Sequence, residues 1–357
     1  MKVAIIIPTI NRPDFMLRQL EFYDQMKSPH PVYISDSSNP ENSEKIKNGI
    51  GEFKNLKVVY QWAPPGKDYV YNLMPLIKEK YCMQVSDDDF MVPKTISECA
   101  EFLESHPDYA TCAGKQVNFY FRQEDFSKPY GIIERQTLPM GKPIEDEGML
   151  DRAQNFLTNP NPPFLCFVVK RVEMEKEIRN LTKHFHPLGD MFEFLILNMV
   201  VIAGKFKVLD KIGYIMQRSI TRFQDHGFTK DFLLYPPFLE QWKICEEGFS
   251  KFISKRGVSE EKSLKIVRWL FMVLFANIYS SEINAPYIGQ KGFLEKTATA
   301  QNKRSWLKKI RHFLSKIPFL KNIYYKFYPP MDVTRPESKY YKDFKPVKDF
   351  LEKTKTP

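Results

Sequence analysis

Three consecutive carboxylates, Asp87, Asp88 and Asp89, follow a short apolar run at residues 81–85. Like charges this close repel each other, and partial burial would raise the pKa values of the three side chains. A divalent cation such as Mg²⁺ or Mn²⁺ would remove the conflict, because carboxylate oxygens are suitable ligands for both ions. The alternative is an acidic turn in water, which is the preferred interpretation for an isolated triplet. The elements around the triplet change that preference.

The first 90 residues alternate between short apolar runs and amphipathic stretches. The run at residues 2–7 is continuous, β-branched and bounded by Pro8, which is typical of a strand buried on both faces of a parallel sheet. Strand–helix alternation of this kind predicts a parallel sheet with helices on both faces. The expected strands are 2–7, 31–35, 56–60 and 81–85, and the expected helices are 13–26, 41–49 and 69–80.

In open parallel sheets, ligands bind beyond the carboxyl ends of the strands. The four predicted strand ends carry polar groups: Thr9 and Asn11, Asp36, the loop 61–67, and the triplet. These groups should therefore converge on one edge of the sheet. No G-x-G-x-x-G or G-x-x-x-x-G-K-[ST] motif is present, so the sequence does not support a dinucleotide-binding site or a P-loop. An anionic ligand at this edge would be held mainly by a metal ion and side chains.

One more candidate carboxylate lies about 100 residues after the triplet. Asp190 stands at the beginning of an apolar helix that runs to about Ala203. The helix dipole favours a negative charge at this position, although an ordinary N-cap residue is the preferred interpretation of Asp190 alone. Residues 122–148 are predicted to be a long loop or lid, and residues 207–217 are predicted to be strands that close the domain.

Together these residues resemble the family 2 glycosyltransferases of the GT-A fold. The resemblance rests on residues 3–13 (VAIIIPTINRP), on Asp36, on the triplet followed by Pro93, and on Gly189-Asp190 heading a helix. It covers roughly residues 1–220. It implies an α/β fold, with a Rossmann-like mixed, mostly parallel sheet and flanking helices, to which this chain adds a C-terminal helical extension. It also implies an enzyme that transfers a sugar from a nucleotide-sugar donor with inversion.

The resemblance assigns the donor to loops at the strand ends. Pro8 and Thr9 match the loop that borders the nucleoside, and Asp36 matches the acidic residue that binds the base. Asp88 matches the aspartate that touches the metal, and Ser86 occupies the first D-x-D position. Which of the three carboxylates coordinates directly stays open. The expected nucleotide-sugar contacts are Pro8, Thr9, Asn11, Arg12, Asp36, Lys67, Asp68, Asp87 and Arg218, and the expected metal ligands are Asp87, Asp88, Asp89 and His226.

Glycosyl transfer needs charge stabilisation at the departing diphosphate and a base near the acceptor hydroxyl. Asp190 matches the second acid of the family's catalytic-base motif, with Gly189 in place of the first. Glu193, one turn later, is the alternative base. His226 could instead be a surface-loop histidine, which is its preferred interpretation. Arg218 and Arg222 are candidate diphosphate contacts.

The basic charge of the chain is concentrated at its C-terminal end. Residues 301–357 hold 15 lysines and arginines against 5 acidic residues, and this net charge of +10 equals that of the whole chain. Residues 303–317 place Trp306 on an apolar face opposite a basic one, and the pattern continues to about residue 328. It predicts attachment to an anionic membrane surface; a helix packed on the body with its basic face in water is the alternative. Residues from about 331 onward are expected to be flexible.

The cysteines and the N-terminal residues indicate the cellular compartment in which the protein is expected. Five scattered cysteines without metal or disulfide spacing indicate reduced thiols. Pro8, Asn11 and Arg12 interrupt the first apolar run before it could form a secretory signal. We expect a cytoplasmic protein, peripheral on the inner face of the plasma membrane, with a GT-A domain at 1–225, a helical region at 226–300 and a basic segment at 301–357.

The leading hypothesis is a Mn²⁺- or Mg²⁺-dependent inverting glycosyltransferase of surface polysaccharide synthesis, acting on a glycan or lipid-linked acceptor. A non-catalytic, membrane-attached protein that binds nucleotide-sugars or glycans is an alternative, because the acid before Asp190 is missing. A nucleotidyltransferase is disfavoured, since its usual Gly-rich basic opening loop is absent. Nucleic-acid binding is not expected, because no nucleic-acid motif accompanies the basic charge.

Overall fold

The computed structural model describes residues 1–64, 69–122, 128–138, 141–159, 163, 165–182, 190–218, 238–288 and 332–353. The chain forms two compact units: residues 1–267 with 343–357 make up unit 1, and residues 268–342 make up unit 2. The domain boundaries expected near residues 225 and 300 fall in segments outside the described residues, so they stay predictions. Unit 1 contains the sheet and the triplet.

The N-terminal half of the sheet is parallel, as the sequence predicts. Strand β1 (Val3–Thr9) lies between β2 (Val32–Asp36) and β4 (Tyr81–Gln84), and β3 (Val58–Trp62) lies beyond β2. The connections contain α1 (Pro13–Gln25), α2 (Pro40–Ile50) and α3 (Tyr69–Leu73). The helix expected at 69–80 is shorter than predicted: a 3₁₀ turn at Met74–Leu76 includes Pro75, and Ile77 is extended.

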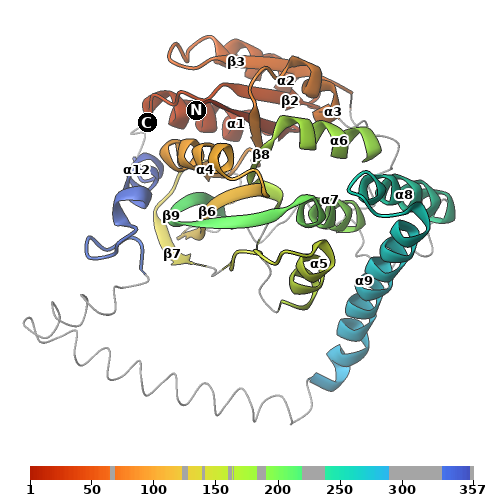
Figure 1. The fold of residues 1–357 in the computed structure, drawn as a ribbon. Coiled ribbons are helices and arrows are strands. Elements are labelled where there is room, and N and C mark those ends of the chain that lie inside the picture. Colours follow the sequence, from red (N-terminus) through yellow and green to blue (C-terminus); the bar gives the residue numbers. More distant parts are fainter. Residues whose placement is uncertain are drawn as a thin grey trace, which may run out of the picture. The chain divides into compact units, whose positions relative to one another are not determined.

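The other half of the sheet makes it mixed (Figure 1). Strand β8 (Val169–Arg171) is antiparallel to both β4 and β6 (Tyr109–Phe121). Strand β9 (Lys205–Gln217) is parallel to β6 and antiparallel to β5 (Phe90–Met91), and β7 (Ile133–Thr137) pairs with β6. Among the described residues this gives nine strands, eight of them in the order β3-β2-β1-β4-β8-β6-β9-β5. The predicted α/β class, with a sheet and flanking helices, is confirmed.

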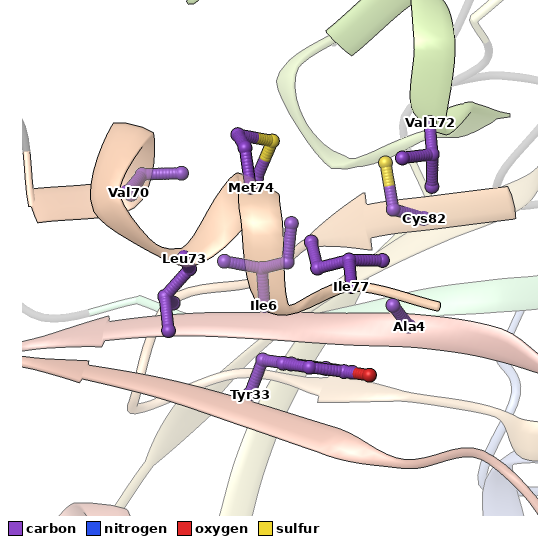
Figure 2. Packing of buried hydrophobic residues seen from close by; sticks show 9 residues of the cluster. All are labelled: Ala4, Ile6, Tyr33, Val70, Leu73, Met74, Ile77, Cys82 and Val172. Atoms are coloured by element: carbon purple, nitrogen blue, oxygen red, sulfur yellow. The ribbon is translucent and has the colours of Figure 1, made fainter. Parts of the chain in front are cut away.

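Strand β1 is buried on both faces, as its unbroken apolar run predicts. Ala4 and Ile6 belong to a buried cluster with Tyr33 of β2, Cys82 of β4 and residues of α3 (Figure 2). Because side chains alternate along a strand, Val3, Ile5 and Ile7 point to the opposite face, where they are also completely buried. The strand that carries Thr9 at its end is therefore fixed from both sides.

Further helices cover the sheet. α4 packs against β1, β6, β8 and β9, whereas α6 packs against β4, β8 and α3, and α7 contacts α5 and β6. Their bounds are α4 Pro93–Ser105, α5 Met149–Thr158, α6 Val172–Thr182, α7 Asp190–Ala203, α8 Phe238–Ser254, α9 Glu260–Ile288 and α12 Tyr341–Leu351. Within the described part of the chain, none of these helices combines the length and apolar character needed to cross a membrane.

Residues from about 331 onward were expected to be flexible, and this prediction is wrong for Tyr341–Leu351, which form α12. Phe344, Val347, Phe350 and Leu351 are all buried, and the ring of Phe350 packs edge-on against Phe22 at a centroid distance of 5.4 Å. The tail is rich in lysine and proline, which suggested flexibility. Its apolar residues nevertheless recur at helical spacing, and this face is long enough to dock a short helix on unit 1.

A buried ion cluster lies between α6 and the end of β4. Glu175 is completely buried and contacts Lys170 Nζ at 2.6 Å and Arg179 Nε at 2.8 Å. Arg179 also donates to Gln84 Oε1 at 2.9 Å, three residues before the triplet. Burial alone would raise the pKa of Glu175, but the charges of Lys170 and Arg179 outweigh it and lower that pKa to about 2. The cluster thus joins α6 to the strand that carries the triplet.

Replacement of Glu175 by glutamine should destabilise the fold by about 3–5 kcal/mol, because Lys170 and Arg179 would be left buried without a counter-charge. The stabilisation belongs to the ionised carboxylate. It is therefore fully present above the unfolded pKa and is lost as pH falls toward the folded value of about 2. Urea unfolding from pH 7 to pH 3 measures the difference. A Glu261→Gln variant, which breaks an exposed pair with Lys265, is the control. Equal stability of Glu175→Gln and wild type at pH 7 would contradict the assignment.

Candidate functional site

The ends of β1 and β4 lie side by side and bring the triplet against the first loop. Val85 N donates to Ile6 O at 3.0 Å, which continues the pairing of the two strands. Thr9 Oγ1 then donates to Asp87 Oδ2 at 2.8 Å. The predicted convergence of the first and fourth strand ends is therefore found, and it forms the centre of the candidate site.

Arg12 clamps two members of the triplet. Its Nη1 lies 2.6 Å from Asp87 Oδ1, and its Nη2 lies 3.1 Å from Asp88 Oδ2. The guanidinium also stacks over the ring of Phe15 at 4.2 Å. Burial alone would lower the pKa of Arg12, but the neighbouring aspartates raise it above its ordinary value. The group is a permanent cation with one third of its side chain in solvent.

Asn11 fixes the backbone from which Arg12 projects. Its φ of 55° lies in the left-handed region, which asparagine tolerates better than most residues. Asn11 N donates to Ser38 Oγ at 2.7 Å, and Asn11 Oδ1 accepts from Asn39 N at 2.9 Å. Asn42 Nδ2 donates to the same oxygen at 3.3 Å. The loops after β1 and β2 are thereby joined, which positions Arg12 in front of the triplet.

The three carboxylates have different surroundings. Asp87 uses both oxygens, one for Thr9 and one for Arg12, and burial raises its pKa to about 6. Asp89 accepts from the hydroxyl of Tyr214 and from Gln217 N, the latter at 2.8 Å; burial and the charge of Asp88 raise its pKa well above the ordinary value. Asp89 is thus tied to β9, and Asp87 is tied to the first loop.

Asp88 is the accessible member of the triplet. About a fifth of its side chain is exposed, compared with 7% for Asp87. Among the described residues, the carboxylate of Asp88 accepts a hydrogen bond only from Arg12. Of the three carboxylates, it is therefore the one that can take a new ligand without losing a buried hydrogen bond.

Two side chains of α1 hold the backbone of the triplet. Arg18 Nη2 donates to Asp88 O at 2.7 Å, and its Nη1 donates to Gln217 Oε1 and to Pro129 O. Gln19 Nε2 donates to Ser86 O and Asp89 O. Burial lowers the pKa of Arg18 to about 10.

The sequence interpretation missed Arg18 and Gln19. The available indication was their place on the apolar face of the helix: Arg18 lies three residues after Phe15 and four before Phe22. A polar residue on an inward-facing helix surface needs buried partners, which here are the backbone oxygens of the triplet.

Asp36 has a structural role in this arrangement. Its carboxylate is completely buried and accepts from Ser38 N at 2.8 Å, Ser43 Oγ at 2.7 Å and the Tyr60 hydroxyl at 2.6 Å. These donors close the turn between β2 and α2. A nucleobase would reach the carboxylate only if one of these groups moved. Pro8 lies next to Ser35 in the register of β1 and β2.

The other predicted residues are only partly described. Asp190 is the first residue of α7, as expected, and Glu193 lies one turn later; the structure describes both by their backbone. Arg218 follows β9, and its backbone N donates to Phe119 O at 2.9 Å. Lys67, Asp68, Arg222 and His226 lie outside the described residues.

Within the part of the chain that the structure describes, no group of three or more histidine, cysteine, aspartate or glutamate side chains could hold a metal ion. His226, one of the predicted ligands, lies outside that part, so the predicted metal site stays a prediction. Asp89 bonds to β9, and both oxygens of Asp87 bond to Thr9 and Arg12. The donor set does fit a cation that takes one carboxylate, that of Asp88, and completes its shell with phosphate oxygens and water. This is a common mode of Mg²⁺ binding in enzymes that act on phosphates.

Comparison with known proteins identifies the fold. The sequence matches no family model and no curated protein. Among solved structures, it is similar to S. aureus TarS 1–349 in complex with UDP-GlcNAc, with 14% identity, a TM-score of 0.50 and coverage of 99% of this chain and 91% of that chain. The mannosyltransferase PcManGT from Pyrobaculum calidifontis, in complex with GDP-Man and Mn²⁺, has 10% identity, a TM-score of 0.39 and coverage of 92% and 88%. At 14% identity, the likeness to TarS concerns the fold alone, and it agrees with the fold predicted from the sequence.

Alanine substitutions should separate the roles within the triplet. Asp89→Ala removes two buried hydrogen bonds to β9 and should lower the free energy of unfolding by about 2–4 kcal/mol. Asp88→Ala removes a partly exposed pair with Arg12, and Arg12 keeps its pair with Asp87, so the free energy of unfolding should change by less than about 1 kcal/mol. Chemical unfolding followed by circular dichroism measures both. The assignment would be wrong if Asp88→Ala proved the more destabilising.

Proposed function

We propose that this protein is an inverting glycosyltransferase that moves a sugar from a nucleotide-sugar donor to a glycan or lipid-linked acceptor. One observation carries the proposal: Thr9, Arg12 and the triplet meet at the carboxyl ends of β1 and β4. In an open α/β sheet this edge is where ligands bind. The fold is shared with a TarS structure that was solved with UDP-GlcNAc, which supports a nucleoside diphosphate sugar as the donor class.

The charges of the site suit a diphosphate. Arg12 offers a planar fork of donors that matches phosphate oxygens, and one third of its side chain is reachable from solvent. Asp88 is the carboxylate that would hold a divalent cation, Mn²⁺ or Mg²⁺, and the cation would stabilise the charge of the leaving diphosphate. Arg18 and Gln19 keep the backbone of the triplet in place, so that Asp88 has a fixed starting position.

The acceptor must lose a proton as its hydroxyl attacks the sugar. We assign this step to the carboxylate of Asp190, which begins α7 and so lies on a different element from the triplet. A base on a separate element can stand on the face of the sugar opposite the leaving group, as inversion requires. Glu193, one turn along the same helix, is the alternative. Synthesis of surface polysaccharide at the inner face of the plasma membrane is the setting that best fits a basic segment at residues 303–328.

Activity variants test the chemistry. Release of nucleoside diphosphate from a panel of UDP- and GDP-sugars with Mn²⁺ should be abolished in Asp88→Ala. In Asp190→Asn, kcat should fall by about 10²–10⁴, the usual share of a general base, while donor affinity is kept. Lys265→Met, on the exposed face of α9, is the control. Undiminished turnover in Asp88→Ala would refute the proposal. Donor binding without turnover in the wild type would favour the non-catalytic alternative, and release of pyrophosphate would favour a nucleotidyltransferase.

Membrane attachment has a separate test. Four charge reversals, Lys303→Glu, Arg304→Glu, Lys308→Glu and Lys309→Glu, should reduce pelleting with anionic liposomes, because each basic residue near such a surface contributes about 1 kcal/mol. Charge reversal is preferable to deletion of residues 301–357, since deletion would also remove α12 from unit 1. Neutral liposomes are the control. Unchanged pelleting of the reversed variant would exclude this segment as the attachment site.

A further inference from the structure

We infer that Arg12 is a resident counter-ion of the triplet that changes partner during the binding cycle. Without a divalent cation it pairs with Asp87 and Asp88. When a cation binds Asp88, the guanidinium leaves that carboxylate and binds the diphosphate of the donor. The inference rests on the proposed function, because it assumes a nucleoside diphosphate ligand and a cation at Asp88.

The first step of the argument is competition for one carboxylate. Arg12 Nη2 lies 3.1 Å from Asp88 Oδ2, and Asp88 is the accessible member of the triplet. A metal ion coordinated by this carboxylate would bring two positive charges against the guanidinium. At about 4 Å, two unit charges near a protein surface interact by about 4 kcal/mol, so the two cations cannot both stay at Asp88 without a large penalty.

The second step is that Arg12 can move while its loop stays fixed. One third of its side chain is exposed, and its contacts are two carboxylates and the ring of Phe15. Asn11, the residue before it, is held by a backbone N–H bond to Ser38 Oγ and by its side-chain Oδ1, which accepts from Asn39 N. Rotation of side-chain bonds is therefore enough to transfer the guanidinium, and the loop can keep its shape.

Arg18 provides the contrast within the same site. Its side chain is 1% exposed, and it donates to two backbone oxygens and to Gln217. Leaving these partners would strand buried acceptors, so Arg18 stays in place. Of the two arginines that bond to the triplet among the described residues, Arg12 is thus the exchangeable one.

The third step is a coupling between ligands. A cation at Asp88 releases a guanidinium whose fork matches phosphate oxygens. A diphosphate that binds the guanidinium in turn removes the competitor of the cation. Each ligand therefore strengthens the binding of the other, and linkage requires the same factor in both directions.

Titration of the full chain with Mn²⁺, followed by the electron paramagnetic resonance of the free ion, measures the competition directly. Arg12→Met should bind Mn²⁺ about tenfold more tightly than the wild type in the absence of nucleotide, which corresponds to about 1.4 kcal/mol. Arg12→Lys keeps a charge but loses the fork, and should lie between the two. Lys265→Met removes an equal charge from the surface of α9 and should stay within about twofold of the wild type. Adding Asp88→Ala to Arg12→Met should abolish the tighter binding.

The coupling is measured by calorimetric titration with UDP and with GDP, in EDTA and in saturating Mn²⁺. In the wild type, Mn²⁺ should tighten binding of one of the two nucleotides, and in Arg12→Met this enhancement should shrink by at least threefold. If Arg12→Met binds Mn²⁺ no more tightly while the wild type binds nucleotide with Mn²⁺, the Arg12 inference is overturned and the proposed function stands. If the wild type binds neither nucleotide, both are overturned. Should circular dichroism show that Arg12→Met does not fold, the Mn²⁺ affinity of Arg12→Lys is compared with that of the wild type instead. Binding no tighter than the wild type would then overturn the inference.

Discussion

Three adjacent carboxylates in a largely buried segment need compensation, and the β1–α1 unit supplies most of it. Arg12 at the start of α1 pairs with Asp87 and Asp88, and Arg18, within the helix, holds the backbone of Asp88. Without these donors, the mutual repulsion and desolvation of the carboxylates would favour protonation or unfolding of the segment. The first helix and the triplet are about 70 residues apart in the chain, and these contacts bring them together.

The same constraint explains why the site draws on distant parts of unit 1. The chain leaves β4, passes through the triplet and enters β5, which pairs with β9; Asp89 accepts hydrogen bonds from Tyr214 and Gln217 of that strand. Helix α12 supports this region from the far end of the chain. The ring of Phe350 packs on Phe90, directly after the triplet, at a centroid distance of 6.0 Å. A residue near the C-terminus therefore helps to fix the segment that carries Asp88.

Local patterns predicted the parts of this structure that depend on local forces. The strands at 2–7 and 81–85 were evident because β-branched or apolar runs end at Pro8 and at the triplet, and the rule for parallel sheets then placed both ends together. Such patterns could not predict that the three aspartates of the triplet have different partners. It depends on pairings across 75 to 128 residues, such as Arg12 with Asp87 and Gln217 with Asp89, which no spacing in the sequence encodes. The same holds for the surroundings of Asp36, whose three buried donors come together only in the fold.

The use of an arginine as the counter-ion also separates folding from metal binding. Structural metal sites gather ligands whose charges only the metal compensates, so that removal of the ion unfolds the protein. Here Arg12 pairs with Asp87 and Asp88, and Tyr214 and Gln217 of β9 donate hydrogen bonds to Asp89, so each carboxylate of the triplet has a partner within the chain. These partners hold the segment without a metal ion. In the binding cycle that we propose, the binding energy of a cation at Asp88 can therefore act on the ligand, by displacing Arg12 and ordering a diphosphate at the edge of the sheet.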